Sequence, residues 1–272
     1  MNMRKMARFT SEQCIQSQVH LGHTSSNWNP DNSGFLLGKR KHNYIFDIRQ
    51  TLLYLHRACN LVREVSSVGG HILFVGRSPK VLAGKGNPYE ELIRVTAESC
   101  GHSYSISHWR NGNLTNWKNR IAQWLQAEEK SFVDEPLSSQ SIKNLYTPGD
   151  FDFQWIKANA SSTSNSGDLF TSLDLSLGTR LSPPDLIFVL GSNSCSQIID
   201  EAYQVGIPVV AIVDSNLILS LRSKISYPIP GNDSSLRAAH LYCSVIAAAI
   251  HEGQSLWLEK DLHIFIENSS KN

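Results

Sequence analysis

Three short runs of consecutive apolar residues are the clearest pattern in the chain. They lie at residues 72–75, 186–190 and 209–213. Each is followed by a residue that favours a turn or is polar: Gly76, Gly191 and Asp214. Strands of a parallel sheet are covered on both faces, so they show continuous apolar runs without alternation. The pattern predicts three buried parallel strands, with residues 43–46 as a weaker fourth candidate.

Helical patterns separate these runs, with apolar residues recurring every three or four positions. The predicted helices begin after Asp47 as N-cap, at about Ser196, and at Asn232 or Asp233, and they end at Gly69-Gly70, Gly206 and Gly253. Parallel strands need crossover connections, and helices commonly provide them. The alternation therefore predicts a doubly wound, Rossmann-like α/β fold, a parallel sheet with helices on both faces.

Residues 131–182 interrupt this alternation. Ten of their first 50 residues are serine, and no helical or strand period is sustained. We expect a serine-rich insertion within one α/β domain. Residues 1–130 form the N-terminal part of that domain, residues 183–255 its C-terminal part, and residues 256–272 a C-terminal tail.

Charge is distributed unevenly, although the net charge of the 272 residues is only +1. Residues 1–130 hold 17 Lys or Arg against 9 Asp or Glu, whereas residues 131–272 hold 8 against 15. The asymmetry indicates one surface turned toward a polyanion and another toward water or basic partners. The alternative is chance clustering of charges on a solvated surface.

The spacing of the cysteines and the length of the apolar runs argue against several classes of protein. The five cysteines are far apart in the sequence and form no CxxC pair, which argues against a disulfide framework and a zinc site. No apolar run approaches the roughly 20 residues of a membrane span. The basic opening, residues 1–8, is too short to decide whether it belonged to a targeting segment.

Enzymatic interpretations find little support. After the first strand the chain reads Gly76-Arg77-Ser78-Pro79-Lys80, which lacks the second glycine of a dinucleotide-binding turn. No phosphate-binding loop of the Walker type, no HExxH zinc motif and no GxSxG nucleophile turn is present. Asp214 stands at a strand end, where a catalytic carboxylate would suit, but capping or turn formation explains it equally well.

Two polar segments rich in aromatic and basic residues point elsewhere. The first, residues 20–30, is followed closely by three consecutive cations, Lys39, Arg40 and Lys41. The second, residues 108–120, contains two Trp, two Arg, one Lys and four Asn. Such residues suit phosphate contact and stacking on exposed bases. Alternatively, the tryptophans anchor the core and the cations are merely solvated, which for Trp117 is an equally good interpretation.

In these segments the chain resembles the universal small-subunit ribosomal protein family S-two, most closely its bacterial and organellar branch. The matching motifs are His20-Leu21-Gly22-His23, Trp28-Asn29-Pro30, residues 69–76, His108-Trp109-Arg110, Leu114-Thr115-Asn116-Trp117, Pro183 with residues 185–189, Glu201-Ala202, Gly206-Ile207-Pro208, residues 211–216, Ile229-Pro230-Gly231-Asn232-Asp233 and Arg237-Ala238. They follow one another in the family's order over about residues 12–253.

The resemblance implies a Rossmann-like sheet without enzymatic role, cofactor or metal. It implies a place between the head and body of the small subunit, in contact with small-subunit ribosomal RNA and neighbouring small-subunit ribosomal proteins. In bacteria the family also helps to hold a messenger-binding protein, so messenger-recruiting proteins are a further expected partner. Neither a membrane nor a second copy of the chain is expected as a partner. The alternatives are a Rossmann-like enzyme that binds a nucleotide or small molecule, and an interaction scaffold away from ribosomes.

Three departures from the family's pattern stand out. Residues 128–182 are too serine-rich and aperiodic for the helical hairpin of bacterial members, Leu217-Ile218-Leu219 replaces a Ser-Asp-Pro element, and Pro79 occupies a helix entry. With the nearly neutral charge, these departures favour a mitochondrial ribosome, fungal first, and hence the mitochondrial matrix. A plastid and a bacterial cytoplasm are the alternatives.

The RNA-binding candidates divide by chemistry. Those for phosphate contact are Lys39, Arg40, Lys41, Arg77, Lys80, Arg110, Lys118 and Arg120. Those for base or sugar contact are His23, Trp28, Trp109 and Asn116. No residue is predicted to be catalytic.

Overall fold

A parallel five-stranded sheet forms the centre of the molecule in the computed structural model, which describes residues 9–76, 88–105, 109, 111–117 and 183–269, with side chains as far as residue 260. Its strands are β4 (Ile72–Gly76), β5 (Ser103–Ser105), β6 (Leu186–Leu190), β7 (Val209–Val213) and β8 (Tyr227–Pro230). They lie in the order β5-β4-β6-β7-β8, and every neighbouring pair is parallel. This order reverses direction between β4 and β6, as in doubly wound sheets. The predicted Rossmann-like α/β fold is confirmed.

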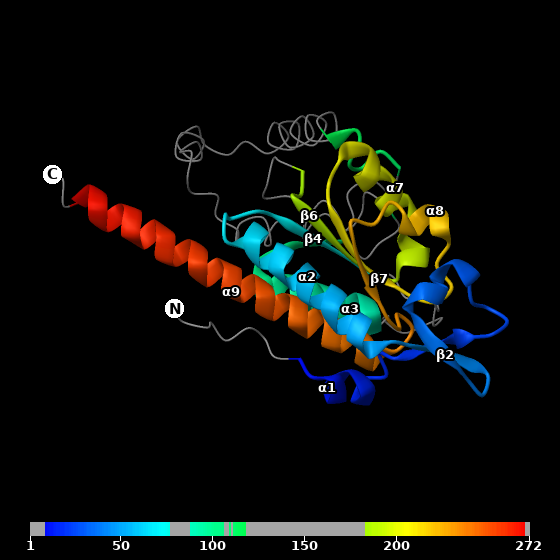
Figure 1. Cartoon of the computed structure of the whole chain (residues 1–272). Helices are drawn as coiled ribbons and strands as arrows, with labels where there is room; N and C mark the ends of the chain where they lie inside the picture. The colour runs from blue at the N-terminus through cyan, green and yellow to red at the C-terminus, as the bar shows by residue number, and fades with distance from the viewer. Residues whose placement is uncertain (1–8, 77–87, 106–108, 110, 118–182, 270–272) are drawn as a thin grey trace.

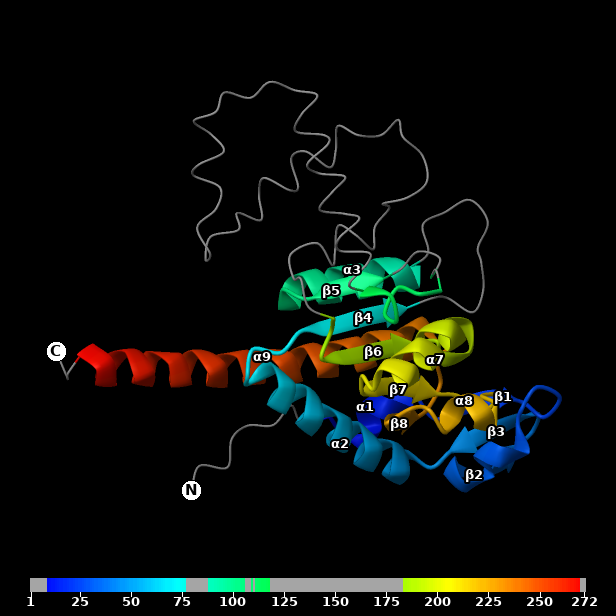
Figure 2. The same cartoon turned by 90° about the horizontal axis from the view of Figure 1, so that it is seen from above.

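Helices cover both faces of this sheet (Figures 1 and 2). One face packs against α2 (Ile48–Ser66), α3 (Pro88–Cys100) and α9 (Leu236–Ser269), and the other against α7 (Ser196–Val205). Successive strand residues point to opposite faces, so in β4 Ile72 and Phe74 join the first core while Leu73 and Val75 join the second. This double burial is why the three central strands are apolar throughout.

A second, smaller sheet is built from the N-terminal region. It comprises β1 (Leu21–Thr24), β2 (Leu36–Arg40) and β3 (Asn43–Phe46), all antiparallel, in the order β1-β3-β2. The short helix α1 (Ser11–Gln16) precedes it in the chain, and the 3-10 helix η1 (Pro30–Phe35) connects β1 to β2. The interpretation of residues 43–46 as a parallel strand of the main sheet is therefore wrong. Burial along Asn43–Phe46 rises from the exposed Asn43 to the buried Phe46, whereas every residue of β6 and β7 is buried.

Two strands of the main sheet were not predicted, β5 and β8, and both lie at its edges. β5 has only three residues, two of them serines, so it carries no apolar run. β8 contains Pro228 and Pro230, which cannot donate backbone hydrogen bonds and are tolerated at an edge. Two further short helices, η2 (Ser192–Cys195) and α8 (Leu219–Arg222), contribute Cys195 and Leu221 to the core on the α7 face of the sheet.

Helix α9 does not end at Gly253, contrary to prediction. A Cβ on Gly253 would lie 2.5 Å from the carbonyl oxygen of Arg63 and 2.5 Å from the Cβ of Ser66, both on α2. The glycine thus allows two helices to approach closely, and it does not terminate α9. The helix begins at Leu236, three residues after Asp233, and continues to Ser269 through the predicted tail. None of the helices in the described ranges has the length and apolar character needed to cross a membrane.

The remaining predicted helix boundaries agree closely with the structure. Asp47 is the N-cap of α2 and accepts a hydrogen bond from the backbone N–H of Arg49, while α7 spans Ser196–Val205 and ends at the left-handed Gly206. All five cysteines are buried and free of disulfides. The predicted serine-rich insertion, residues 131–182, lies outside the described residues.

Candidate nucleic-acid interface

The hairpin of β2 and β3 presents three consecutive cations to solvent. Lys39 and Arg40 end β2, Lys41 lies in the two-residue turn, and all three side chains are exposed. Lys41 has a φ of 57°, in the left-handed region that tight hairpin turns require. In the described part of the chain, no acidic side chain forms an ion pair with these cations. Their positive charge is therefore available to an external anion.

An aromatic pair lies on one face of the same hairpin. The rings of Trp28 and Tyr44 have centroids 4.2 Å apart and an interplanar angle of 31°. Tyr44 pairs directly with Lys39 across the two strands, so their side chains share a face. Arg40 pairs with Asn43 and therefore points to the opposite face. The hairpin thus carries one cation beside the stacked rings, one on its other face and one at its tip.

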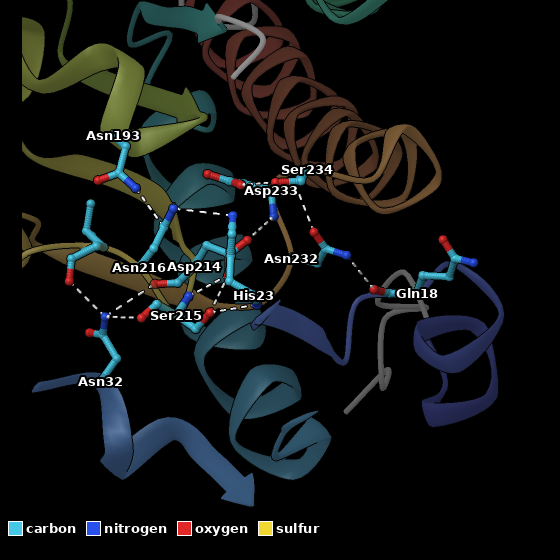
Figure 3. Close-up of polar contacts among 11 residues, drawn as sticks. Gln18, His23, Asn32, Asn193, Asp214, Ser215, Asn216, Asn232, Asp233 and Ser234 are labelled. Atoms are coloured by element: carbon cyan, nitrogen blue, oxygen red, sulfur yellow. Dashed lines mark hydrogen bonds and ion pairs between the residues drawn. The ribbon is translucent and has the colours of Figure 1, made fainter. Parts of the chain in front are cut away.

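The small sheet is fastened to the main sheet through the loop that follows β7 (Figure 3). The backbone N–H of His23 donates to Oγ of Ser215 at 2.9 Å, and that of Asn29 donates to the carbonyl oxygen of Ser215 at 2.7 Å. The buried Asn32 donates through Nδ2 to the carbonyl oxygens of Leu217 at 2.8 Å and Ser215 at 3.1 Å. These contacts fix the base of the hairpin against the carboxyl end of β7.

Arg222 completes this junction from the side. It follows the loop in α8, and its Nη1 donates to the carbonyl oxygen of Asp31 at 2.7 Å and to Oδ1 of Asn32 at 3.1 Å. Its guanidinium also lies 5.3 Å from the centre of the Phe35 ring. The side-chain amide of Asn32 is therefore engaged at both its nitrogen and its oxygen.

Asp214 is the buried charge at the centre of the junction. Its Oδ1 lies 3.0 Å from Nδ1 of His23, and its Oδ2 accepts the backbone N–H of Asp233 at 3.1 Å. Nε2 of His23 lies 3.3 Å from Nδ2 of Asn216, which fits the neutral imidazole with its proton on Nδ1. His23, a predicted base or sugar contact, thus has both ring nitrogens engaged within the protein.

The pKa of the neighbouring Asp233 carboxyl is raised by its surroundings. Burial, and then the negative charge of Asp214, raise the pKa of Asp233 from the ordinary value of 3.8 to about 8. Proton uptake by this pair of carboxyls relieves the repulsion between two buried negative charges. Asp214 therefore serves as an acceptor that joins two strand ends, in agreement with the capping or turn role considered above.

The central motif is held by a different carboxylate, Glu201 on α7. Its Oε1 accepts the indole N–H of Trp109 at 3.1 Å and the backbone N–H of Gly112 at 2.7 Å, and its Oε2 accepts the backbone N–H of Leu114 at 2.9 Å. Trp109 is only 6% exposed and packs in the second core. The expectation that Trp109 contacts a base is corrected, because the ring has no face left for stacking. Trp117 is partly buried against the same core.

The other predicted RNA contacts are distributed as follows. Asn116 is exposed in the turn that follows Trp109, away from the hairpin in the chain. Arg77, Lys80, Arg110, Lys118 and Arg120 lie outside the described residues. The structure therefore brings together Trp28, Lys39, Arg40 and Lys41 on the small sheet, with His23 at its base. Asn32, Glu201 and Arg222 were missed, since no local motif marks a residue whose partners are distant in the sequence.

The glycines at the strand ends have roles in packing. A Cβ on Gly76 would clash with Ile93 of α3, so this glycine lets the helix pack against the end of β4. Gly191 has a φ of 81° and turns the chain into η2, where the hydroxyl of Ser192 donates to the carbonyl oxygen of Ile212. Within the described ranges, no group of three or more His, Cys, Asp or Glu side chains is arranged to hold a metal ion.

Comparison with known proteins identifies the family. The family described as Ribosomal protein S2 matches residues 14–253. The chain is 33% identical over 248 residues to the small ribosomal subunit protein uS2 of Paramagnetospirillum magneticum, covering 90% of this chain and 83% of that protein. It is 34% identical over 250 residues to uS2 of Acidiphilium cryptum, covering 89% and 85%. It is also 34% identical over 251 residues to uS2 of Rickettsia typhi, covering 92% and 77%.

These matches bear on both the fold and the alternatives. They extend over both parts of the α/β domain, and the relatives named above are all bacterial. The enzymatic alternative gains no support from them, in line with the packing role of Gly76 and the turn at Gly191. A match over most of the chain, together with the expected sheet and motifs, settles the relationship. This chain belongs to the ribosomal protein S2 family.

Proposed function

We propose that this protein is a structural constituent of the small ribosomal subunit, where it binds ribosomal RNA and neighbouring small-subunit proteins. The observation that carries the RNA contact is the hairpin of β2 and β3, with three exposed cations that form no ion pair with any residue the structure describes. Phosphate contacts from Lys and Arg supply most of the affinity of proteins for nucleic acids. Membership of a ribosomal protein family supports ribosomal RNA as the nucleic acid that this hairpin contacts.

The two-sided arrangement of the cations favours insertion of the hairpin between RNA strands. Lys39 and Arg40 point to opposite faces, so a single flat phosphate backbone would not engage both. A groove or junction offers phosphates on two sides. On the Lys39 face the Trp28 and Tyr44 pair adds a surface on which an unstacked base or a ribose can pack.

The junction around Asp214 would position this hairpin. It joins the small sheet to the carboxyl end of β7 through His23, Asn29 and Asn32, each of which has a partner within residues 214–217. A hairpin fixed in this way loses less conformational freedom when it binds than a free loop would. His23 is accordingly proposed as a positioning residue for RNA contact, in place of the direct contact predicted from the sequence.

The finer parts of the function extend the proposal. Arg77, Lys80, Arg110, Lys118 and Arg120 are further phosphate contacts, and Asn116 a base or sugar contact. The protein would lie between the head and body of the subunit and would also touch messenger-recruiting proteins. We place it in the mitochondrial matrix, on the grounds of its nearly neutral charge and its departures at residues 79 and 217–219. The bacterial relatives are equally compatible with a bacterial cytoplasm, and a plastid is the third alternative.

Sedimentation tests the ribosomal assignment. The tagged full-length protein is followed through sucrose gradients of a lysate and of its organelle fraction, at magnesium levels that keep the subunits joined or separate them. We expect co-migration with the small subunit under both conditions, in the fraction that contains its compartment. A peak at the top of both gradients would contradict the proposed function.

The hairpin is tested by charge reversal in the same assay. Lys39→Glu with Arg40→Glu should shift the protein toward the top of the gradient, because two phosphate contacts become repulsive. The matched control is Arg57→Glu with Arg237→Glu, which makes the same change of charge at exposed positions outside the hairpin. Both double variants should melt within a few degrees of the parent protein. If the hairpin variant sediments like the control, the hairpin is not the RNA contact.

A further inference from the structure

Helix α9 extends beyond the part of the chain that matches the family. The match ends at residue 253, whereas the helix continues to Ser269, so its last 16 residues lie beyond the matched range. Figures 1 and 2 show this end of α9 projecting away from the sheet, with no other described element beside it. At about 1.5 Å per residue, the extension is roughly 24 Å long.

Just after Gly253, the body of the protein covers α9 only in part. The indole nitrogen of Trp257 lies 3.3 Å from where a Cβ on Gly69 would be, shortly after the end of α2. Trp257 is nevertheless 40% exposed, and Leu258 is 60% exposed. The body of the protein therefore covers part of Trp257 and leaves an apolar surface at the point where the extension begins.

The sequence of the extension continues an apolar stripe. Leucine at 258 is followed by leucine at 262 and phenylalanine at 265, a spacing of four and three residues that is typical of one helix face. A stripe with this spacing on a projecting helix is therefore suited to packing against another surface.

The net charge of the extension indicates what kind of surface it can pack against. Residues 254–269 contain Glu259, Asp261 and Glu267 against Lys260 alone, so they carry a net charge of −2. RNA and anionic membranes would repel such a helix. The serine-rich residues 131–182 hold three Lys or Arg against six Asp or Glu, so they are not its electrostatic complement either. Complementarity requires a basic partner.

We propose that residues 254–269 are a docking helix for another protein, which presents an apolar groove rimmed by Lys and Arg. The apolar stripe enters the groove, and the flanking carboxylates face the basic rim, as in other complexes of an amphipathic helix with a groove. This proposal concerns a protein partner and does not depend on the hairpin or on RNA binding.

A photo-crosslinking amino acid at position 258 of the full-length protein tests the proposal in cells. We expect a crosslink to one other protein, at a segment with apolar residues flanked by Lys or Arg. A crosslinker at the exposed Leu53 of α2 is the matched control for chance encounters and should not reach that segment. Attachment to RNA, to lipid, to residues 131–182 or to a second copy of this chain would overturn the proposal, as would no attachment.

Charge variants of the extension test whether the basic rim of the partner contributes to binding in addition to the apolar stripe. Glu259→Lys with Asp261→Lys should lower the crosslink yield roughly fivefold or more, the loss typical of an important interface residue. Lys260→Glu, the control of opposite sign, should preserve or raise the yield. Equal yields for all three proteins would overturn the basic rim. Because the crosslink is measured separately from sedimentation, a hairpin variant that leaves the ribosome tests the proposed function without bearing on this result.

Hydrogen exchange of the isolated full-length protein supplies a second measurement. The amides of residues 258–269 should exchange much faster than those of residues 238–250, which the sheet and α2 bury. Equal protection of the two stretches would show that the extension already packs within its own chain, which would overturn the proposal.

Discussion

Asn32 offers the sharpest test of the junction between the two sheets. Its side chain is fully buried, and its Nδ2 donates to the carbonyl oxygens of Leu217, Ser215 and Asp214 at 2.8, 3.1 and 3.4 Å. Its Oδ1 accepts from Nη1 of Arg222 at 3.1 Å. We therefore consider two substitutions, Asn32→Ala and the isosteric Asn32→Asp.

The expected magnitudes follow from these contacts. Asn32→Ala removes two good donor contacts, one weaker contact and one acceptor. Each hydrogen bond contributes about 1 kcal/mol net, and a buried carbonyl without a donor costs about 1–3 kcal/mol, so a loss of about 2–4 kcal/mol is expected. Asn32→Asp keeps the shape and the Arg222 contact but directs a carboxylate oxygen at the carbonyl oxygens. It should therefore be at least as destabilising as the alanine variant, despite its closer shape.

Urea unfolding of the full-length protein, followed by circular dichroism, measures these losses. Asn27→Ala is the matched control, because Asn27 belongs to the same segment but is exposed, and it should change the free energy of unfolding by less than about 0.5 kcal/mol. If Asn32→Asp unfolds at the same urea concentration as the parent protein, the junction does not carry the energy assigned to it.

Three further predictions concern other buried contacts. Since the folded state holds the pKa of Asp233 at about 8, above its ordinary value of 3.8, its contribution to stability is complete below the lower value and is lost as the pH rises through the higher one. Asp233→Asn should flatten this decline in urea unfolding at pH 5, 7 and 8.5. An unchanged slope would contradict it. Gly253→Val should lower the free energy of unfolding by about 2 kcal/mol or more through overlap with α2, whereas Gly34→Ala, where a Cβ meets nothing within 4 Å, should change it little. Glu201→Gln should cost about 1–3 kcal/mol, because an amide group cannot accept all three N–H groups; equal stability in thermal melts would refute this.

The central strands were predictable because their burial leaves a local signal. β4, β6 and β7 are covered on both faces, so every residue in them is apolar. The edge strands carry no such signal. β5 consists of Ser103–Ser105, and in β8 proline occupies positions that pair with Ala211 and Val213. Composition alone would place both segments in loops.

Glycine and short strands are ambiguous for a different reason. A glycine after an apolar stripe can end a helix or allow a neighbouring helix to approach, and Gly253 does the second because α2 passes against it. Residues 43–46 form a strand, but the sequence does not say which sheet it joins. In both cases the outcome depends on an element that is distant in the sequence.

The candidate interface was predictable only where it is exposed. Three consecutive cations on the hairpin are visible in the sequence because exposed side chains depend on no distant partner within the chain. Trp109 was misjudged because its partner, Glu201, lies 92 residues away. The same holds for Asn32, which is 185 residues from Leu217, its nearest partner. A buried polar residue is defined by its partners, and no local pattern records them.

The polar groups at the carboxyl ends of the strands have a different role here from their role in enzymes with the same fold. In doubly wound sheets, ligands bind at the carboxyl ends of the strands, where polar groups converge on an open crevice. Here the polar groups after β7 and β8 converge on one another. The Asp214 side chain contacts Nδ1 of His23 and accepts hydrogen bonds from the Ser215 hydroxyl and the backbone N–H of Asp233. Nδ2 of Asn32 donates to backbone carbonyl oxygens of the same loop. Such a network restrains the small sheet against the large one, and a restrained hairpin would lose less conformational entropy in the proposed RNA contact than a mobile one. Loosening the network should therefore weaken RNA binding even when every cation of the hairpin is retained.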